Sequence, residues 1–168
     1  EDRNYVTIVV LIKQVPEIAL IKVDTAANQV VLPAGPGVLN PFDEYAVEEA
    51  LRIKEKTNGK VIVVSVGTER TESALRDCLA LGVDDAYLLT DPSFAGSDPQ
   101  GVARILAAGL KKLGQFELVL AGKQAIDSDS AQVPAAVAAH FPGAGGASSS
   151  IAKAPHPPAP ACSTPSPS

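Results

Sequence analysis

Four apolar runs alternate along this chain with segments whose apolar residues recur every three to four positions. Short runs without polar interruption are typical of strands buried on both faces of a sheet, and the wider spacing predicts amphipathic helices. We therefore expect strands over residues 7–12, 60–67, 86–90 and 118–121, and helices over residues 40–57, 71–81, 98–112 and 135–139.

The segment before the first helix follows neither pattern. Residues 18–32 alternate β-branched and polar side chains around a polar turn, which predicts a small hairpin after the first strand. Residues 33–38 hold two Gly and two Pro and are expected to form a loop. Asn40 can then cap the first helix, with Pro41 in its first turn, although the same Asn also suits a ligand site.

Strands that alternate with helices favour a doubly wound α/β fold with a mainly parallel sheet. Such folds bind ligands at the carboxyl ends of the strands, where the strand order reverses. This rule selects four groups of residues: Lys13 and Gln14, residues 66–68, residues 122–133, and the nearby Asn40.

The loop at residues 122–133 carries the most informative chemistry. Pro134 has no N–H to donate, so it belongs in the first turn of the next helix, which then starts near residues 130–133. Free N–H groups at a helix start attract anions, and the hydroxyls of Ser128 and Ser130 can assist a bound phosphate. Alternatively, Asp129 or Ser130 simply caps the helix.

The beginning of that loop adds a reason to expect a ligand. Gly122 permits a close backbone approach, and Lys123 and Gln124 follow it at the edge of the sheet. Capping alone does not need these residues. The loop therefore favours a nucleotide.

Composition narrows the function further. Of the 168 residues, 46% are hydrophobic and 4% aromatic, which indicates a core of Val, Leu, Ile and Ala. The net charge of −5 gives no basic patch, so nucleic-acid binding is not expected. Because no apolar run reaches the length of a membrane span and no secretory signal is visible, we expect a soluble, intracellular protein.

Motifs for catalysis and metal binding are absent from the sequence. There is no Walker A sequence, no Gly-x-Gly-x-x-Gly and no Gly-x-Ser-x-Gly. Cys78, Cys162, His140 and His156 have neither a metal-ligand spacing nor a nucleophile partner, so we expect no catalytic and no metal residues. The chain is predicted to bind a ligand and not to catalyse a reaction.

The final residues differ from the rest in composition. Residues 142–168 are rich in Pro, Ser and Ala and hold one charged side chain, Lys153. Such a segment cannot form a core and is predicted to be disordered or extended. We thus expect one nucleotide-binding domain at residues 1–141 and a tail at residues 142–168.

Four blocks of this sequence resemble the beta subunit of electron-transfer flavoprotein. They are VLIKQVP at residues 10–16, NPFDEYAVEEALR at residues 40–52, ALGVD at residues 80–84 and GKQAID at residues 122–127. The resemblance covers roughly residues 5–141, and the order and spacing of the second and fourth blocks make it specific. It implies that the chain is the truncated amino-terminal two-thirds of a family member; the absence of Met indicates a processed or trimmed chain.

The resemblance implies a Rossmann-like domain of the adenine nucleotide alpha-hydrolase type, paired with an alpha subunit. The heterodimer carries FAD, shared with the alpha subunit, and takes electrons from an acyl-CoA dehydrogenase or another flavin dehydrogenase, as in fatty acid β-oxidation. It passes them to a quinone oxidoreductase or another acceptor. The beta subunit itself holds AMP in most members and a second FAD in electron-bifurcating members. The chain is therefore expected to be an electron-carrier subunit and not an enzyme.

The resemblance also implies which residues contact the nucleotide. They lie at the strand ends that the topology selects, and Lys123 and Asn40 are the side chains expected to matter most. The full set is Leu11, Asn40, Pro41, Phe42, Asp43, Val66, Gly122, Lys123, Gln124, Ala125, Ile126, Asp127, Ser128, Asp129, Ser130, Ala131, Gln132 and Val133.

One departure keeps both nucleotides open. Ala131 and Val133 stand where the common AMP-type loop has Asn and Thr, so this loop is more similar to that of the bifurcating and nitrogen-fixation-associated members.

Two other classes of nucleotide-binding protein share a similar sheet. A stand-alone sensor of the universal-stress type has a late Gly-x-x-Gly loop that is not visible here. An ATP pyrophosphatase has a Ser-Gly-Gly loop where Lys13 and Gln14 stand.

Overall fold

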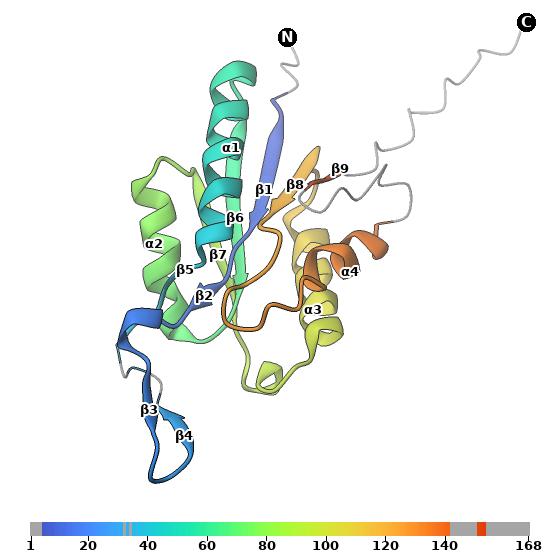
Figure 1. Cartoon of the computed structure of the whole chain (residues 1–168). Helices are drawn as coiled ribbons and strands as arrows, with labels where there is room; N and C mark the ends of the chain where they lie inside the picture. The colour runs from blue at the N-terminus through green and yellow to red at the C-terminus, as the bar shows by residue number, and fades with distance from the viewer. Residues whose placement is uncertain (1–4, 32, 34, 142–150, 154–168) are drawn as a thin grey trace, which may run out of the picture.

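The computed structural model describes residues 5–31, 33, 35–141 and 151–153. Five strands form its central sheet in the order β7-β6-β1-β8-β9 (Figure 1), with β9 antiparallel to β8 and the other pairs parallel. The strands are β1 (Thr7–Leu11), β6 (Lys60–Val66), β7 (Asp85–Leu89), β8 (Leu118–Ala121) and β9 (Ile151–Lys153). The four expected strands and the mainly parallel sheet are confirmed.

The order of the strands reverses next to β1. The chain moves from β1 outward to β6 and β7, then crosses to the other side of β1 to form β8. Val10 of β1 therefore lies between Val63 of β6 and Leu120 of β8. The switch point between β1 and β8 is the position where doubly wound folds bind their ligands.

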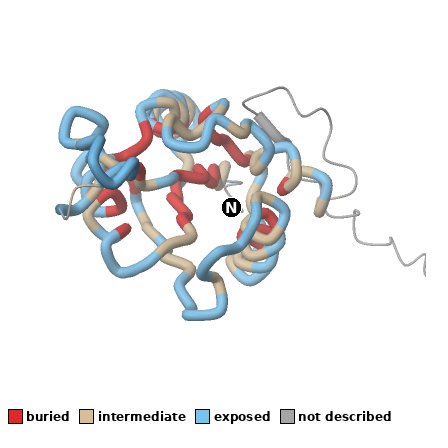
Figure 2. The backbone as a smooth tube through the Cα atoms, turned by 60° about the horizontal axis from the view of Figure 1, so that its bottom comes forward, coloured by how far each residue is buried: buried red, intermediate tan, exposed pale blue. Residues whose placement is uncertain are grey.

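Helices cover both faces of the sheet (Figure 1). Ile8 and Val10 of β1 pack in the cluster with α1 and α2, whereas Val9 and Leu11 pack in the cluster with α3 and α4. In Figure 2 the buried backbone accordingly lies in the middle of the molecule. The helices are α1 (Pro41–Thr57), α2 (Glu72–Ala80), α3 (Pro99–Leu113) and α4 (Val133–Ala139).

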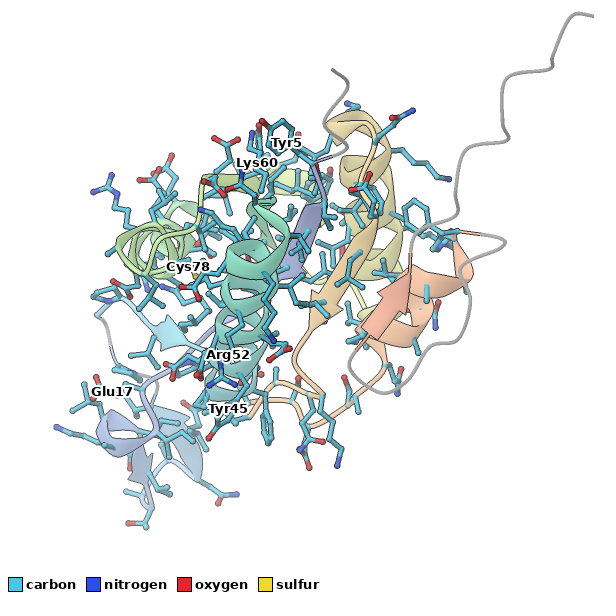
Figure 3. All side chains as sticks on the ribbon, turned by 90° about the horizontal axis from the view of Figure 1, so that it is seen from above. Tyr5, Glu17, Tyr45, Arg52, Lys60 and Cys78 are labelled. Atoms are coloured by element: carbon cyan, nitrogen blue, oxygen red, sulfur yellow. The ribbon has the colours of Figure 1, made fainter. Side chains whose placement is uncertain are left out.

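The ends of α1 follow the predicted signals. Pro41 lies in the first turn, and Asn58 ends the helix in the left-handed conformation with φ 54°. Val47 and Ala50 are fully buried against the sheet. Tyr45 and Arg52 extend from the helix into solvent (Figure 3).

The inward faces of α2 and α3 carry small as well as large apolar residues. In α2, Ala74, Leu75 and Cys78 are buried, whereas Leu79 is 42% exposed. In α3 the small Ala103 and Ala107 reach the core beside Leu106 and Leu110, and Leu113 packs against the same cluster. Small residues allow the helix to lie close to the sheet, which a search for large apolar residues does not detect.

The hairpin after β1 is confirmed. It extends away from the sheet as β3 (Lys22–Asp24) and β4 (Gln29–Val31) (Figure 1). The expected loop at residues 33–38 is shorter than predicted, because β5 (Val38–Leu39) pairs with β2 (Gln14–Val15). Three short 3-10 turns complete the described structure: η1 (Ile18–Leu20), η2 (Glu69–Thr71) and η3 (Pro92–Phe94).

Part of the tail adds to the sheet. Ile151–Lys153 pair with Leu118–Leu120 as an antiparallel edge strand, so these three residues are extended and are not disordered. The rest of the predicted tail lies outside the described residues. Among the helices that the structure describes, none is long and apolar enough to cross a membrane.

Candidate functional site

A pocket of about 330 Å³ opens at the carboxyl ends of β1, β6 and β8, at the switch point. This volume lies in the range of small-molecule sites. The start of α1, the segment that leads into α3, and the loop at residues 122–133 complete its walls. The lining residues are Leu11, Ile12, Lys13, Asn40, Asp43, Val66, Ser97, Pro99, Val102, Leu106, Ala121, Gly122, Gln124, Ala125, Ser128, Ser130, Ala131, Gln132, Val133 and Pro134.

The structure brings most of the predicted site residues to this pocket. Leu11, Asn40, Asp43 and Val66 line it, as does most of the loop after β8. Other predicted residues do not belong to its lining within the described part of the chain: Pro41, Phe42, Lys123, Ile126, Asp127 and Asp129.

Lys123, one of the two side chains expected to matter most, is exposed and lies outside the lining. Among the described residues that line the pocket, the cationic one is Lys13, which follows the end of β1. Its Nζ contacts both carboxylate oxygens of Asp127, at 2.7 Å and 2.8 Å. This partly exposed ion pair joins the loop after β1 to the loop after β8.

Gln14, which the topology rule selected with Lys13, lies elsewhere. Its side chain donates to the carbonyl oxygen of Arg70 at 2.7 Å and to the hydroxyl of Ser73 at 2.9 Å. These contacts tie β2 to the start of α2. Gln14 thus contributes to the fold next to the pocket and does not line it.

Asn40 is 1% exposed and does not cap α1 through its side chain in the described structure. Its Nδ2 donates to the carbonyl oxygen of Gln124 at 2.9 Å, and its Oδ1 accepts from the N–H of Ile126 at 3.2 Å. Asn40 thus occupies the N-cap position of α1, but its side chain binds the loop after β8 instead of the helix, because this loop offers the amide a donor and an acceptor at once.

Asp43 is 5% exposed and joins two strand ends. Its Oδ2 accepts from the N–H of Lys13 at 2.8 Å, and its Oδ1 accepts from the N–H of Gly122 at 3.1 Å. Burial raises the pKa of this carboxyl to about 6, although both hydrogen bonds oppose the rise. A Cβ on Gly122 would collide with Asp43 Oδ1 and with the backbone of Phe42, which explains why glycine occupies this position.

The loop itself turns tightly. The N–H of Asp129 donates to the carbonyl oxygen of Ala125 at 2.8 Å, and the side chain of Gln124 donates to Asp129. Asp129 and Ala131 adopt left-handed backbone conformations, with φ 52° and 51°. Ala131 has no side-chain polar group to favour this conformation, so the backbone here carries strain.

The start of α4 confirms one expectation and corrects another. The helix begins at Val133 with Pro134 in its first turn, as predicted. The residue before the helix is Gln132, and in the described structure its side chain makes no capping bond. Neither Asp129 nor Ser130 therefore occupies the cap position, because the left-handed turn at Ala131 separates them from the helix.

A family model described as "Electron transfer flavoprotein domain" matches residues 28–142. The chain belongs to the electron transfer flavoprotein family. An electron transfer flavoprotein subunit beta from Thermoanaerobacterium thermosaccharolyticum is 47% identical over 126 residues, which are 75% of this chain and 48% of that protein.

Further relatives carry different names. The caffeyl-CoA reductase-Etf complex subunit CarD of Acetobacterium woodii is 45% identical over 78% of this chain and 50% of its own length. Protein FixA of Azotobacter vinelandii is 44% identical over 77% of this chain and 47% of its own length. The chain spans about half the length of the curated relatives it matches.

One wall of the pocket in this electron transfer flavoprotein chain was missed by the sequence analysis. Ser97, Pro99, Val102 and Leu106 come from α3 and the segment before it. The topology rule selected the loops after β1, β6 and β8, but not the segment after β7. The position of α3 in the chain could have indicated this wall, because the helix between β7 and β8 crosses the sheet at the switch point.

Within the described residues, no group of His, Cys, Asp and Glu side chains is arranged to hold a metal ion. Cys78 is buried and lies away from the pocket lining. Burial raises the pKa of its thiol to about 12, so the thiol is protonated at neutral pH.

Proposed function

We propose that the pocket binds the adenine nucleotide of an electron transfer flavoprotein beta subunit, either AMP or a second FAD. The observation that carries this proposal is the coincidence of three features at one place. The switch point of the sheet, the pocket, and most of the residues implied by the family resemblance all meet between β1 and β8.

The chemistry of the walls supports this assignment. Val66, Val102 and Leu106 give an apolar surface that suits a flat aromatic ring. The hydroxyls of Ser128 and Ser130 and the backbone of the loop after β8 also line the pocket, and they suit ribose and phosphate oxygens. The residues present therefore fit an adenine nucleotide.

The function that follows is that of an electron-carrier subunit. A bound FAD, shared with the alpha subunit, supplies the redox chemistry, and this chain binds and orients. The donor is an acyl-CoA dehydrogenase or another flavin dehydrogenase, and the acceptor is a quinone oxidoreductase or another electron acceptor. The protein acts in the bacterial cytoplasm or, in a eukaryote, in the mitochondrial matrix.

The test is to purify the chain with an alpha subunit, denature the complex, and count the released nucleotides by chromatography with absorbance at flavin wavelengths. One FAD and one AMP per heterodimer support the AMP form, and two FAD support the second-flavin form. A complex without nucleotide contradicts the proposal. ATP bound by the chain alone, without flavin or partner, indicates a nucleotide sensor instead.

A matched pair of variants locates the nucleotide. Ser97 is exposed and lines the pocket, so Ser97→Trp narrows it without entering the core. Ala95 is exposed on the same segment and lies outside the lining. We expect Ser97→Trp to lose the AMP or second FAD and Ala95→Trp to keep it; equal nucleotide content in both variants places the nucleotide elsewhere.

A further inference from the structure

The strands β1 and β8 separate at the pocket. Their parallel pairing ends with Leu11 opposite Ala121. Beyond that pair, Ile12 still donates its N–H to the carbonyl oxygen of Val64 in β6, but the N–H groups of Lys13 and Gly122 need acceptors from outside the sheet. Asp43 supplies both, because its two oxygens accept from Lys13 and from Gly122.

Asn40, three residues before Asp43, also connects the start of α1 to the loop after β8. It is one turn before Asp43 and binds the backbone of Gln124 and Ile126. The first turn of α1 thus contacts the end of β1, the end of β8 and the loop that follows β8. These are three of the segments that form the pocket.

We infer that Asp43 is a positioning residue of the nucleotide site: its carboxylate bridges the ends of β1 and β8 and holds them at the separation that forms the pocket. The inference rests on the proposed function, since it concerns the same site. Asp43 acts through the backbone of Lys13 and Gly122 and needs no contact with the nucleotide.

The residue type matters for this bridge. An ionised carboxylate offers acceptors on both sides, whereas a protonated carboxyl or an amide places a donor against one of the two N–H groups. Since the pKa of Asp43 is about 6, the bridge is complete only above that pH. The bridge should therefore strengthen as the pH rises towards 8.

Other titratable groups surround Asp43. They are the Lys13 ammonium, which is paired with Asp127, the Glu44 carboxyl on α1, and the protonated Cys78 thiol on α2. A variant that is changed only at residue 43 retains all of these groups and His140, the one histidine that the structure describes. The phosphate of the ligand is also the same in both titrations. Their titration therefore cancels in the ratio of the two affinities.

The experiment uses the full chain and its Asp43→Asn variant, titrated with AMP and separately with FAD between about pH 5 and pH 8. We expect the variant to bind about tenfold more weakly at pH 8, the effect of one buried donor left unsatisfied. The ratio should fall towards one at pH 5, where the native carboxyl is also protonated. Equal affinities at pH 8, or a ratio independent of pH, overturn the inference.

Asp84→Asn is the matched control. Asp84 also bridges two groups, Lys54 Nζ and the N–H of Val61, but at the opposite end of the sheet. We expect this variant to bind AMP and FAD as the native chain does. A comparable loss of affinity in Asp84→Asn means that Asp43 acts through general stability, which overturns the positioning role.

Amide hydrogen exchange separates this inference from the proposed function. In Asp43→Asn, exchange should accelerate at Lys13 or Gly122, whichever N–H faces the new NH2 group, and stay slow at Val61 and at Val9 of the buried β1. In Asp84→Asn, exchange should accelerate at Val61. In the native chain, protection at Lys13 and Gly122 should fall relative to Val61 as the pH drops below about 6, which requires no mutation. Unchanged protection overturns the bridge. If the native chain binds neither nucleotide, the proposed function fails and the exchange pattern alone decides whether Asp43 bridges the strands.

Discussion

The two ends of the sheet are both held to α1 by an aspartate, but in different surroundings. At the pocket end, Asp43 is 5% exposed and accepts from two backbone N–H groups. At the other end, the Asp84 side chain is 33% exposed and contacts Lys54 Nζ at 2.7 Å and the Val61 N–H at 2.8 Å. Burial raises the pKa of Asp43 to about 6. Partial burial would also raise the pKa of Asp84, but its hydrogen bonds from Lys54 and Val61 outweigh this and lower it.

The comparison shows that the two ends serve different purposes. The Asp84 end also carries the ion pair of Lys60 with Asp85 at 2.5 Å and the bond from the Thr7 N–H to Glu117 at 2.6 Å; Lys60 lies near Tyr5 at this end (Figure 3). The charged side chains in these contacts, Lys60, Asp85 and Glu117, are all at least partly exposed to solvent. At the pocket end, burial of the Asp43 carboxylate removes it from water, which disfavours its ionised form and costs folding free energy. Such a cost is typical of functional sites.

The largest expected effect is a pH dependence of stability that has opposite signs at the two ends. The pKa of Asp43 is raised from 3.8 to about 6 in the folded state, so the folded protein binds the proton more tightly than the unfolded chain. The free energy of unfolding should therefore fall by about 3 kcal/mol as the pH rises from about 4 to 6. The lowered pKa of Asp84 contributes stability that is present above its unfolded pKa and is lost as the pH falls.

Urea unfolding of the native chain and of Asp43→Asn across this pH range measures the first contribution. The difference in unfolding free energy between the two should change with pH in the direction stated. A constant difference between pH 4 and pH 7 contradicts the burial of an ionisable Asp43.

The next prediction concerns the close contact between Gly122 and Asp43 at the pocket end. Gly122→Ala places a Cβ against Asp43 Oδ1 and the backbone of Phe42, which should lower the free energy of unfolding by about 2 kcal/mol. The control is Gly35→Ala, because a Cβ at Gly35 meets no atom within 4 Å. The denaturant midpoints of both variants measure this loss. Equal midpoints would show that the end of β8 moves aside without losing folding free energy.

A smaller loss is expected from the other end. Asp84→Asn removes the ion pair with Lys54 and should cost about 1 kcal/mol, an amount limited by solvent screening. The loss should shrink at high salt because the pair is partly exposed. Thermal unfolding at low and high ionic strength measures it, and a loss that does not depend on salt argues against an electrostatic contribution.

The smallest effect concerns the loop backbone. Asn tolerates the left-handed conformation better than Ala, so Ala131→Asn should raise the free energy of unfolding by about 0.5 kcal/mol. Ala95 has φ −60°, and Ala95→Asn should give no such gain. A gain of the same size at both positions, measured by chemical unfolding, would show that backbone conformation is not its cause.

The sequence alone predicted the strands, the helix starts and the place of the pocket. The runs at β1, β6 and β8 are apolar because both of their faces are buried, and this is visible without any partner being known. Pro41 and Pro134 marked helix starts because proline cannot donate an N–H. The alternation of strands and helices located the switch point.

Only the tertiary structure decided which polar groups meet. The sequence left open whether Asn40 caps its own helix or belongs to a ligand site; in the structure its side chain binds Gln124, 84 residues away, and Asp43 binds Gly122, 79 residues away. Lys123 was predicted at the site and lies outside the lining, whereas Val102 and Leu106 of α3 form part of it. Local patterns report burial and backbone conformation. The partner of a buried amide or carboxylate depends on which strand ends the fold brings together, and no local pattern carries that information.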